Sequence, residues 1–262
     1  MLSGLIVYSK NDKDKNIWFI NSCIEKLSSK GLSLIYKDED DVLEYAKNNH
    51  VDFVIYRARD YQLVEKLEAL NIRCFNNSLT NKIANNKYLT YQYLLKQNIK
   101  SLESFETFNK LSYPLVMKSV DGHGGQDVFL IKKEEDIAKY QKPGKQYIFQ
   151  EFYKNNGDLR LYVLNKKVIG AVLRNNDSDF RSNFSLGGEV KAYEPEQELV
   201  DTAIEIAKSL NADYIGVDFL RAGDKWLVNE IEDPVGARML YKASGIDAIS
   251  LFIEYIYTSL MR

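Results

Sequence analysis

The first third of the chain alternates short apolar runs with segments whose apolar residues recur every three or four positions. One such segment carries Ile17, Ile20 and Leu27, and Gly31 follows where a helix would end. The alternation predicts strands at 4–9, 32–36, 51–57 and 72–76, with further helices at 41–49 and 61–71. Strands that alternate with helices indicate a parallel, doubly wound sheet. We expect this α/β unit to span residues 1–76.

The rest of the chain has the pattern of two α+β units. In residues 77–152 we expect a helix at 77–98, strands at 112–120, 127–133 and 146–153, and a helix at 134–140. In residues 153–262 we expect strands at 159–165 and 166–174, a polar loop at 175–190, helices at 198–211 and 246–260, and a hairpin between those helices. The last helix is rich in Tyr and Ile, which makes it a candidate face for a homodimer.

Three acids interrupt the apolar hairpin at residues 214–239. Asp218 lies in its first strand, and Glu230 and Glu232 lie in its second. A turn centred on Asp224 would place Asp218 opposite Glu230, with Glu232 on the same face. Opposed like charges destabilise a sheet, and partial burial strengthens the repulsion. We therefore expect positive charge here, and oxygen ligands favour Mg²⁺ or Mn²⁺ over zinc.

The alternative is a solvated strand face whose acids pair with lysines. We expect Trp226 and Val228 on the acidic face, which argues against a simply wet surface. The apolar residues expected to hold the acids from the opposite face are Val217, Phe219, Leu227 and Ile231.

A glycine-rich loop joins two predicted strands of the central unit. Gly122, Gly124 and Gly125 permit positive φ and close backbone approach, so successive N–H groups can converge on an anion. Lys118 ends the strand before the loop. This arrangement favours a nucleotide-phosphate site without the spacing of a P-loop, and a flexible hairpin loop is the alternative. His123 lies in the loop, where we expect its side chain to face solvent.

Composition narrows the choice of partners. The 35 basic and 37 acidic residues give a net charge of -2, which provides no argument for nucleic acid or an anionic membrane. Cys23 and Cys74 make no disulfide framework, and two histidines do not indicate a zinc site. The sequence shows no signal peptide and no bilayer-spanning segment, so we expect a cytoplasmic protein.

The order of these motifs resembles the ATP-grasp superfamily, and within it the RimK-type amino-acid ligases, which attach glutamate to protein or small-molecule carboxyl groups. The similarity covers most of the chain from about residue 80 onward, and residues 179–188 are similar to that group's Arg-Ser-Asn…Gly-Gly segment. The resemblance implies an ATP-grasp fold, with an N-terminal Rossmann-like domain and two α+β lobes that clasp ATP. It divides the chain into an N-terminal domain (1–76), a central lobe (77–152) and a C-terminal lobe (153–262).

The resemblance also implies roles for individual residues. Lys87, at the start of a helix, and Lys118 would contact the ATP phosphates under the glycine loop. The hinge would comprise Gln150, Glu151, Phe152 and Tyr153, and the backbone of the last two would read the adenine edge. Asp158 would lie near the ribose, and Arg160 follows the hinge among the ATP-binding residues. The ligands of two Mg²⁺ or Mn²⁺ ions bridging the β- and γ-phosphates would be Asp218, Glu230 and Glu232.

Ligases of this kind activate a carboxylate as an acyl phosphate, which an amine attacks to form an amide with release of ADP and phosphate. Such chemistry needs alignment and cations more than proton transfer. We expect Arg174 and Arg181 to line the acyl-phosphate site, Asn183 to position it, and Arg238 to clamp the substrate carboxylate. For each arginine the alternative is a surface residue paired with an acid. The implied partners are ATP, a carboxylate substrate and an amine, either an amino acid or a peptide.

The chain departs from the family pattern at two places. Glu232 stands where the family usually has Asn, and the added charge favours metal binding and acceptance of Mn²⁺. Ser185 and Leu186 stand where close relatives carry His and Arg, which weakens the case for the same acidic substrate. The alternative functions are an ATP-grasp kinase of a hydroxyl substrate and a non-catalytic ATP-binding regulatory protein.

Overall fold

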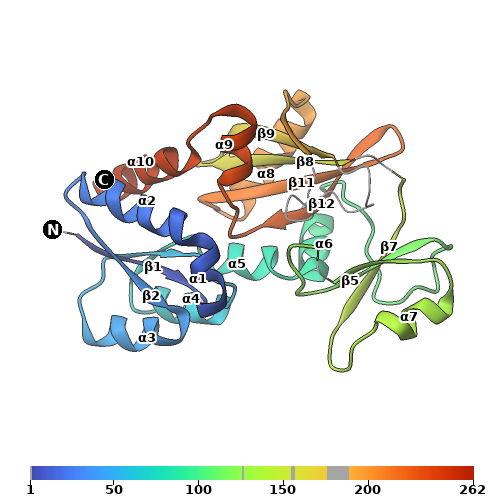
Figure 1. The fold of residues 1–262 in the computed structure, drawn as a ribbon, viewed down its shortest axis with the longest axis horizontal. Coiled ribbons are helices and arrows are strands. Elements are labelled where there is room, and N and C mark those ends of the chain that lie inside the picture. The colour runs from blue at the N-terminus through green and yellow to red at the C-terminus, as the bar shows by residue number, and fades with distance from the viewer. Residues whose placement is uncertain (1, 126, 155–156, 176–188) are drawn as a thin grey trace.

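The structure, a computed structural model, describes residues 2–125, 127–154, 157–175 and 189–262. These residues form three sheets, in the order β2-β1-β3-β4, β6-β5-β7 and β10-β9-β8-β11-β12. Figure 1 shows the N-terminal sheet at one end of the molecule, the three-stranded sheet at the other, and the five-stranded sheet between and above them. The predicted mixed α/β fold class is confirmed by this arrangement of one parallel and two antiparallel sheets.

The N-terminal sheet is parallel and covered on both faces. Its strands are β1 (Ser3–Tyr8), β2 (Ser33–Asp38), β3 (Phe53–Tyr56) and β4 (Arg73–Phe75). Helices α3 (Glu39–Asn48) and α4 (Tyr61–Glu68) pack on one face, and α2 (Ile17–Ser28) packs on the other. Burial on both sides explains why the two central strands, β1 and β3, are apolar at most positions. The short helices α1 (Lys10–Lys13) and η1 (Asp14–Asn16), which precede α2, were not predicted.

The central lobe begins with two helices rather than the single one predicted. Helix α5 (Ser78–Ala84) ends at Asn85, and α6 (Lys87–Lys96) begins after Asn86. The Asn86 side chain accepts a hydrogen bond from the backbone N–H of Leu89 and thereby caps the second helix. The sheet contains β5 (Leu115–Ser119), β6 (Val128–Ile131) and β7 (Tyr147–Glu151), and α7 (Glu134–Tyr140) packs against it. The break in the helix makes Lys87 the first residue of α6.

The C-terminal lobe is built on the five-stranded antiparallel sheet. Its strands are β8 (Gly157–Leu164), β9 (Lys167–Asn175), β10 (Glu189–Ala192), β11 (Tyr214–Ala222) and β12 (Lys225–Glu232), and its helices are α8 (Gln197–Ser209) and α9 (Arg238–Ser244). Strand β10 and helix α9 were not predicted. Along β8, Leu159, Leu161 and Val163 face the core that includes α8, whereas Asp158, Arg160 and Tyr162 point to the other side. The polar face of this sheet therefore carries its charges close to the N-terminal domain.

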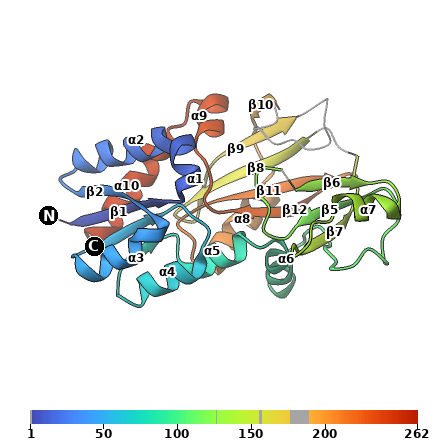
Figure 2. The same cartoon turned by 60° about the horizontal axis from the view of Figure 1, so that its bottom comes forward.

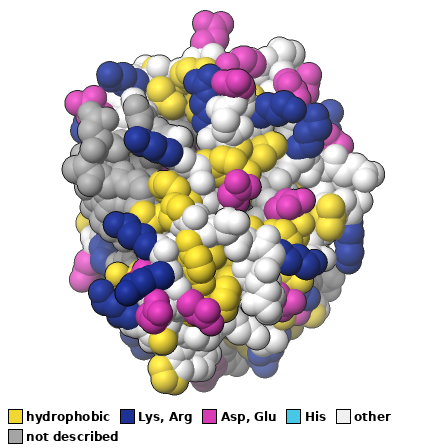
Figure 3. Space-filling model, turned by 90° about the vertical axis from the view of Figure 1, so that its right-hand side faces the viewer, with side chains coloured by type: hydrophobic (Ala, Val, Ile, Leu, Met, Phe, Trp, Pro, Cys, Tyr) yellow, Lys and Arg dark blue, Asp and Glu magenta, His cyan; other side chains and the backbone are white. Residues whose placement is uncertain are grey.

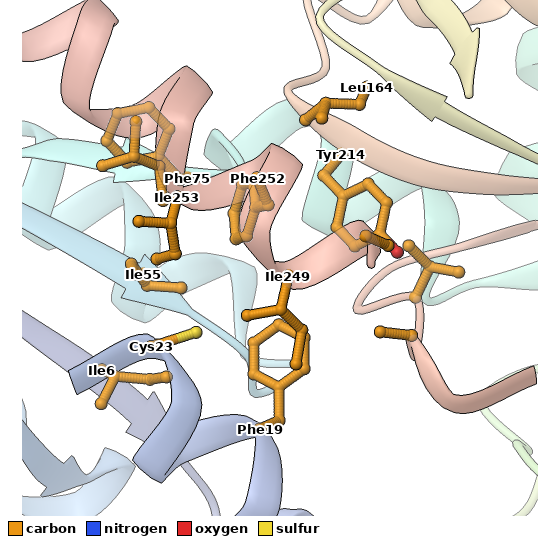
Figure 4. Close-up of a cluster of buried hydrophobic side chains, with 14 of the residues drawn as sticks. Ile6, Phe19, Cys23, Ile55, Phe75, Leu164, Tyr214, Ile249, Phe252 and Ile253 are labelled. Atoms are coloured by element: carbon orange, nitrogen blue, oxygen red, sulfur yellow. The ribbon is translucent and has the colours of Figure 1, made fainter. Parts of the chain in front are cut away.

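The last helix, α10 (Ala248–Leu260), packs between the N-terminal domain and the C-terminal lobe. Figure 4 shows Phe252, Ile249 and Ile253 of α10 between strands of the N-terminal sheet and Tyr214 of β11. These side chains are buried inside the molecule and are not available to a second subunit, and the expectation of a homodimer stays a prediction. Figure 2 shows the same helix beside α2, at the end of the molecule where the N-terminus lies.

The surface and the helices give two further observations. Figure 3 shows charged side chains of both signs, with small apolar areas between them, over the end of the molecule that lies at the right of Figure 1. Within the described ranges, none of the helices combines the length and apolar character needed to cross a bilayer. Cys23 and Cys74 are buried and unbridged, as the sequence predicted.

Candidate active site

The three acids of the hairpin lie on neighbouring strands. Asp218 of β11 pairs with Glu230 of β12, as predicted, and Gly216 pairs with Glu232. On the other side of β11, Asp218 pairs with Arg160 of β8. The acids therefore share a sheet face with a residue that sequence reasoning had assigned to nucleotide binding.

The hairpin reaches this register by a different route from the predicted one. Its turn is centred between Gly223 and Asp224, because Ala222 pairs with Lys225. Asn229 is an extra residue that forms a β-bulge between the turn and the acids. The bulge shifts the pairing by one residue, which restores the predicted partners of the acids.

The bulge also reverses which residues of β12 face the core. Val228 is buried in the apolar cluster with Phe219 and Ile231, and Trp226 packs against the same cluster. The expectation that Val228 and Trp226 lie on the acidic face is therefore wrong. Leu227, expected behind the acids, instead lines a pocket near β7. A regular strand would keep Val228 and Glu230 on one face, and the bulge separates them.

Two buried arginines hold the acids of this face. The Nε and Nη2 atoms of Arg160 donate to the two carboxylate oxygens of Asp218 at 2.6 and 2.7 Å, and Nη2 also donates to Glu232 Oε2 at 2.8 Å. Arg174 Nη2 donates to Asp218 Oδ2 at 2.6 Å, and its Nε donates to Asp158. The two arginines thus connect four strands of the sheet, β9, β8, β11 and β12.

The pKa values of Asp218 and Asp158 differ because the two acids bind different numbers of arginines. Burial would raise the pKa of Asp218, but Arg160 and Arg174 together lower it to about 2. Asp158 is also buried and bonded directly to Arg174 alone, so burial prevails and its pKa is raised. Asp218 is therefore the strongly ionised member of the cluster.

Two lysines approach Glu230 from the central lobe. Lys118 Nζ donates to Asn229 Oδ1 at 2.9 Å and to Glu230 Oε1 at 3.3 Å. Lys87 Nζ lies 3.9 Å from Glu230 Oε2 and donates to the backbone carbonyl of Gly122 in the glycine loop. Burial would raise the pKa of Glu230, but the two lysines lower it, whereas burial lowers the pKa of Lys118.

The protein itself supplies the positive charge that the sequence predicted on the acidic face. Four carboxylates are matched by four cations, which are Arg160, Arg174, Lys87 and Lys118. The expectation that divalent ions and a nucleotide complete the charge balance stays a prediction. The hairpin's own sequence does not indicate the arginines, because strands β8 and β9, which carry them, are distant from it in sequence.

A small pocket, here called the inner pocket, lies between these charges and the glycine loop. Its walls include Lys87, the loop residues 121–125, Arg160 and all three acids of the hairpin. The backbone N–H of Lys87 donates to Val120 O at 2.9 Å, which holds the start of α6 against the loop. His123 is exposed at the edge of this pocket. The inner pocket gathers residues from the central and C-terminal lobes around one point.

Two features of the inner pocket were not predicted from the sequence. The Oγ atom of Ser119 is buried there and has no hydrogen-bond partner among the described residues. A Cβ atom on Gly122 would lie only 2.2 Å from that oxygen, so the loop passes too close for any other residue without a shift of Ser119. Arg59, from the loop after β3, reaches the pocket with its Nη1 bound to Asp12 at 2.9 Å. Its position depends on tertiary contact, which local sequence patterns do not report.

A second pocket, the hinge pocket, has a volume of about 510 Å³. Glu151, Tyr153, Leu102 and Leu227 are among its walls, and the Tyr153 hydroxyl donates to Glu151 at 2.8 Å. Gln150 is buried beside it and donates to Ser104 Oγ at 2.8 Å. Phe152 follows the end of β7 between two of these wall residues. Asp158 is bonded to Arg174, and its expected place near a ribose stays a prediction.

A third pocket, the outer pocket, has a volume of about 410 Å³ and lies between the N-terminal domain and the C-terminal lobe. Its walls include Arg160, Arg174 and Arg238. It shares Gly124, Arg160 and Glu232 with the inner pocket, so the two pockets adjoin. Arg181 and Asn183 lie outside the described residues, as does the whole of the Arg-Ser-Asn segment at residues 179–188.

The oxygen atoms of the acidic face suit a hard divalent cation. Among the described residues, however, no cluster of three or more Asp, Glu, His or Cys side chains is arranged to hold an ion without other ligands. Mg²⁺ commonly takes one or two carboxylates and completes its shell with phosphate and water oxygens. Glu230 and Glu232 beside the inner pocket fit an ion that arrives with a nucleotide.

Comparison with known proteins gives three findings. A family model described as "RimK-like ATP-grasp domain" matches residues 73–256. An uncharacterized protein of Mycoplasma pneumoniae is 33% identical over 249 residues, which cover 91% of this chain and 86% of that protein. A protein of Haemophilus influenzae named "Probable alpha-L-glutamate ligase" is 26% identical over 260 residues, which cover 90% of this chain and 86% of that protein.

Solved structures support the same grouping at the level of fold. The structure of D-alanine–D-alanine ligase from Bacillus anthracis superposes with a TM-score of 0.79 at 18% identity, covering 100% of this chain and 98% of that one. The same ligase complexed with ATP superposes with a TM-score of 0.76 at 16% identity, and the match covers 100% of this chain and 97% of that one.

Proposed function

The chain belongs to the RimK-like ATP-grasp family, and from that premise we propose that it joins a carboxylate to an amine with the use of ATP. The family match agrees with the ligase class that the motifs predicted. The observation that carries the proposal is the shared wall of the inner and outer pockets. A carboxylate in the outer pocket would lie beside a phosphate in the inner one, which is the proximity that phosphoryl transfer requires.

We place the triphosphate of ATP in the inner pocket and its adenine in the hinge pocket. The glycine loop offers backbone N–H groups to the phosphates, and Gly124 and Gly125 have the positive φ values, +64° and +75°, that let such groups converge. Lys87 and Lys118 supply cations at the same place. Ser119 Oγ would donate its proton to a phosphate oxygen, which accounts for a buried hydroxyl that otherwise has no described partner.

The reaction needs two steps. A carboxylate oxygen attacks the γ-phosphorus, the bond from that phosphorus to the β–γ bridging oxygen breaks, and ADP leaves with the electron pair. The amine nitrogen then attacks the acyl carbon, the bond from carbon to the phosphate oxygen breaks, phosphate leaves, and the nitrogen loses a proton. Arg160 and Arg174 lie on the wall where negative charge would gather in both steps. Mg²⁺ or Mn²⁺ bound with the nucleotide would neutralise phosphate charge.

When ATP and metal bind, the acids must exchange partners. Glu230 and Glu232 are held by Lys118, Lys87 and Arg160, and these cations are the groups that phosphate oxygens would attract. We propose that the phosphates take the cations while the metal takes the acids, so that net charge stays balanced. Glu232, in place of the usual Asn, adds a carboxylate that favours acceptance of Mn²⁺.

The test is an ADP-release screen of amino acids and short peptides in pairs, with products identified by mass spectrometry. We expect one acid–amine pair to release ADP and yield a product joined by loss of water. Glu230→Gln should remove turnover and keep the fold, as judged by circular dichroism; retained turnover would contradict the assignment of Glu230. A phosphorylated hydroxyl product would instead support a kinase. ADP release at background with every pair would favour a regulatory ATP-binding protein.

A further inference from the structure

We propose that the outer pocket selects a carboxylate substrate with a large apolar, preferably aromatic, group, and that Trp18 is the residue that selects it. The inference rests on the proposed ligase function. It concerns two walls of the pocket, one cationic and one apolar. The apolar wall is formed by Trp18, Phe19 and Met239.

Trp18 is not required by the core of the N-terminal domain. Helix α2 buries Phe19, Ile20, Cys23 and Leu27, whereas the Trp18 side chain is 47% exposed. An indole so exposed forgoes much of the stabilisation that burial would give. Its place on the wall of a pocket that adjoins the inner pocket gives it a contact surface for a ligand. Ile17, its neighbour, is 45% exposed and does not line this pocket.

The buried Arg57 contacts two segments that line the outer pocket, helix α2 and the chain that follows β12. The guanidinium carbon of Arg57 lies 4.3 Å from the centre of the Phe19 ring, and its Nη2 donates to the carbonyl of Val235 at 2.6 Å. Val235 precedes Gly236 and Ala237, which line the outer pocket opposite α2. The wall beside Trp18 is therefore held in place before any substrate binds, which lowers the entropy cost of binding.

The cationic wall supplies the complementary half of the recognition. Arg160 and Arg174 are already bound to Asp218, whereas Arg238 has no ion pair with any residue that the structure describes. Arg238 is exposed at the start of α9 and is thus available to a carboxylate. A ligand that meets both walls has a carboxylate at one end and an apolar group at the other. Aromatic amino acids and peptides that end in one have this chemistry, whereas glutamate would place a second carboxylate against Trp18.

Direct binding can be read from Trp18 itself. The chain has two tryptophans, so Trp226→Phe leaves Trp18 as the only one. In this variant we expect L-phenylalanine and L-tyrosine to shift or quench the indole emission at concentrations about tenfold lower than L-glutamate or L-alanine do. Equal response to all four compounds, or no response, would overturn the inference.

Turnover gives a second measure of the same selectivity. Trp18→Ala should raise the KM for the aromatic substrate about tenfold while the KM for ATP stays unchanged, and Trp18→Phe should recover most of the loss. Ile17→Ala is the matched control and should leave both constants unchanged. ADP release with small acidic amino acids that is insensitive to Trp18→Ala would overturn this inference and leave the ligase function standing. Selective Trp18 emission changes without ADP release would instead count against the ligase function.

Discussion

Replacement of Arg160 by Gln tests whether the arginines hold the acidic face together. Arg160 makes two hydrogen bonds to Asp218 and one to Glu232. The pKa of Asp218, about 2, is nearly two units below its ordinary value of 3.8. A shift of that size corresponds to about 2 kcal/mol of stability at neutral pH, shared between Arg160 and Arg174. Removal of one partner of a buried ion pair costs about 3–5 kcal/mol, and because Arg174 remains we expect a loss of about 3 kcal/mol.

The assay is urea unfolding followed by fluorescence, with the free energy of unfolding compared at pH 7 and at acid pH. The contribution of Asp218 is fully present above its unfolded pKa of about 4 and is lost as the pH falls towards about 2. The difference between wild type and Arg160→Gln should therefore shrink over that range. Lys10→Gln is the control, because Lys10 and its partner Asp40 are both exposed and such a pair contributes little to stability. If Arg160→Gln lowers the free energy of unfolding at pH 7 by no more than Lys10→Gln does, the arginines do not hold the acidic face together.

Three further predictions concern the central lobe. Lys118→Ala should weaken ATP binding about tenfold in calorimetry, because Lys118 is a buried cation beside the inner pocket, and unchanged affinity would remove it from the phosphate site. Gly124→Ala should raise the KM for ATP because φ is +64°, whereas Gly144→Ala, with φ of +77° in a loop that does not line the inner pocket, should not; equal effects would mean that strain alone is responsible. Asp127→Asn should cost up to about 1 kcal/mol at pH 7, since hydrogen bonds from Lys142 and Lys145 lower the pKa of Asp127. That cost should vanish as the pH falls below about 4, and a cost that persists in acid would show that charge is not its origin.

Much of the fold follows from the sequence because its signals are local. The parallel sheet and the hairpin depend on alternation over a few residues, whereas the predicted pairing of Asp218 with Glu230 is met only because the β-bulge offsets the different position of the turn. The ATP-grasp resemblance and the ligase class are confirmed by the family match and by named relatives. The domain boundaries after residues 76 and 152, the cytoplasmic location and the roles of individual site residues stay predictions.

The errors arise where distant segments meet. The placement of Arg160 and Arg174 beside Asp218 depends on the register of β8 against β11, which are separated by a long stretch of chain. Arg59 and Trp18 reach the pockets from the N-terminal domain, which carries no site motif of its own. The apolar residues of α10 pack against α2, which lies more than two hundred residues away in sequence, so local patterns do not indicate this contact.

The extra residue in β12 reverses the alternation of side chains, so that even-numbered residues face opposite sides of the sheet before and after it. On the turn side of Asn229, even-numbered Val228 belongs to the apolar layer, and beyond it even-numbered Glu230 belongs to the charged one. Deletion of Asn229 would leave both neighbours facing as they do now, since a regular strand would then alternate correctly through them. The hydrogen bond from Lys118 Nζ to Asn229 Oδ1 would disappear. The bulge therefore matters for the hydrogen bond to Lys118 rather than for the direction of the acids. A variant that lacks Asn229 would remove this hydrogen bond while the hairpin still folds.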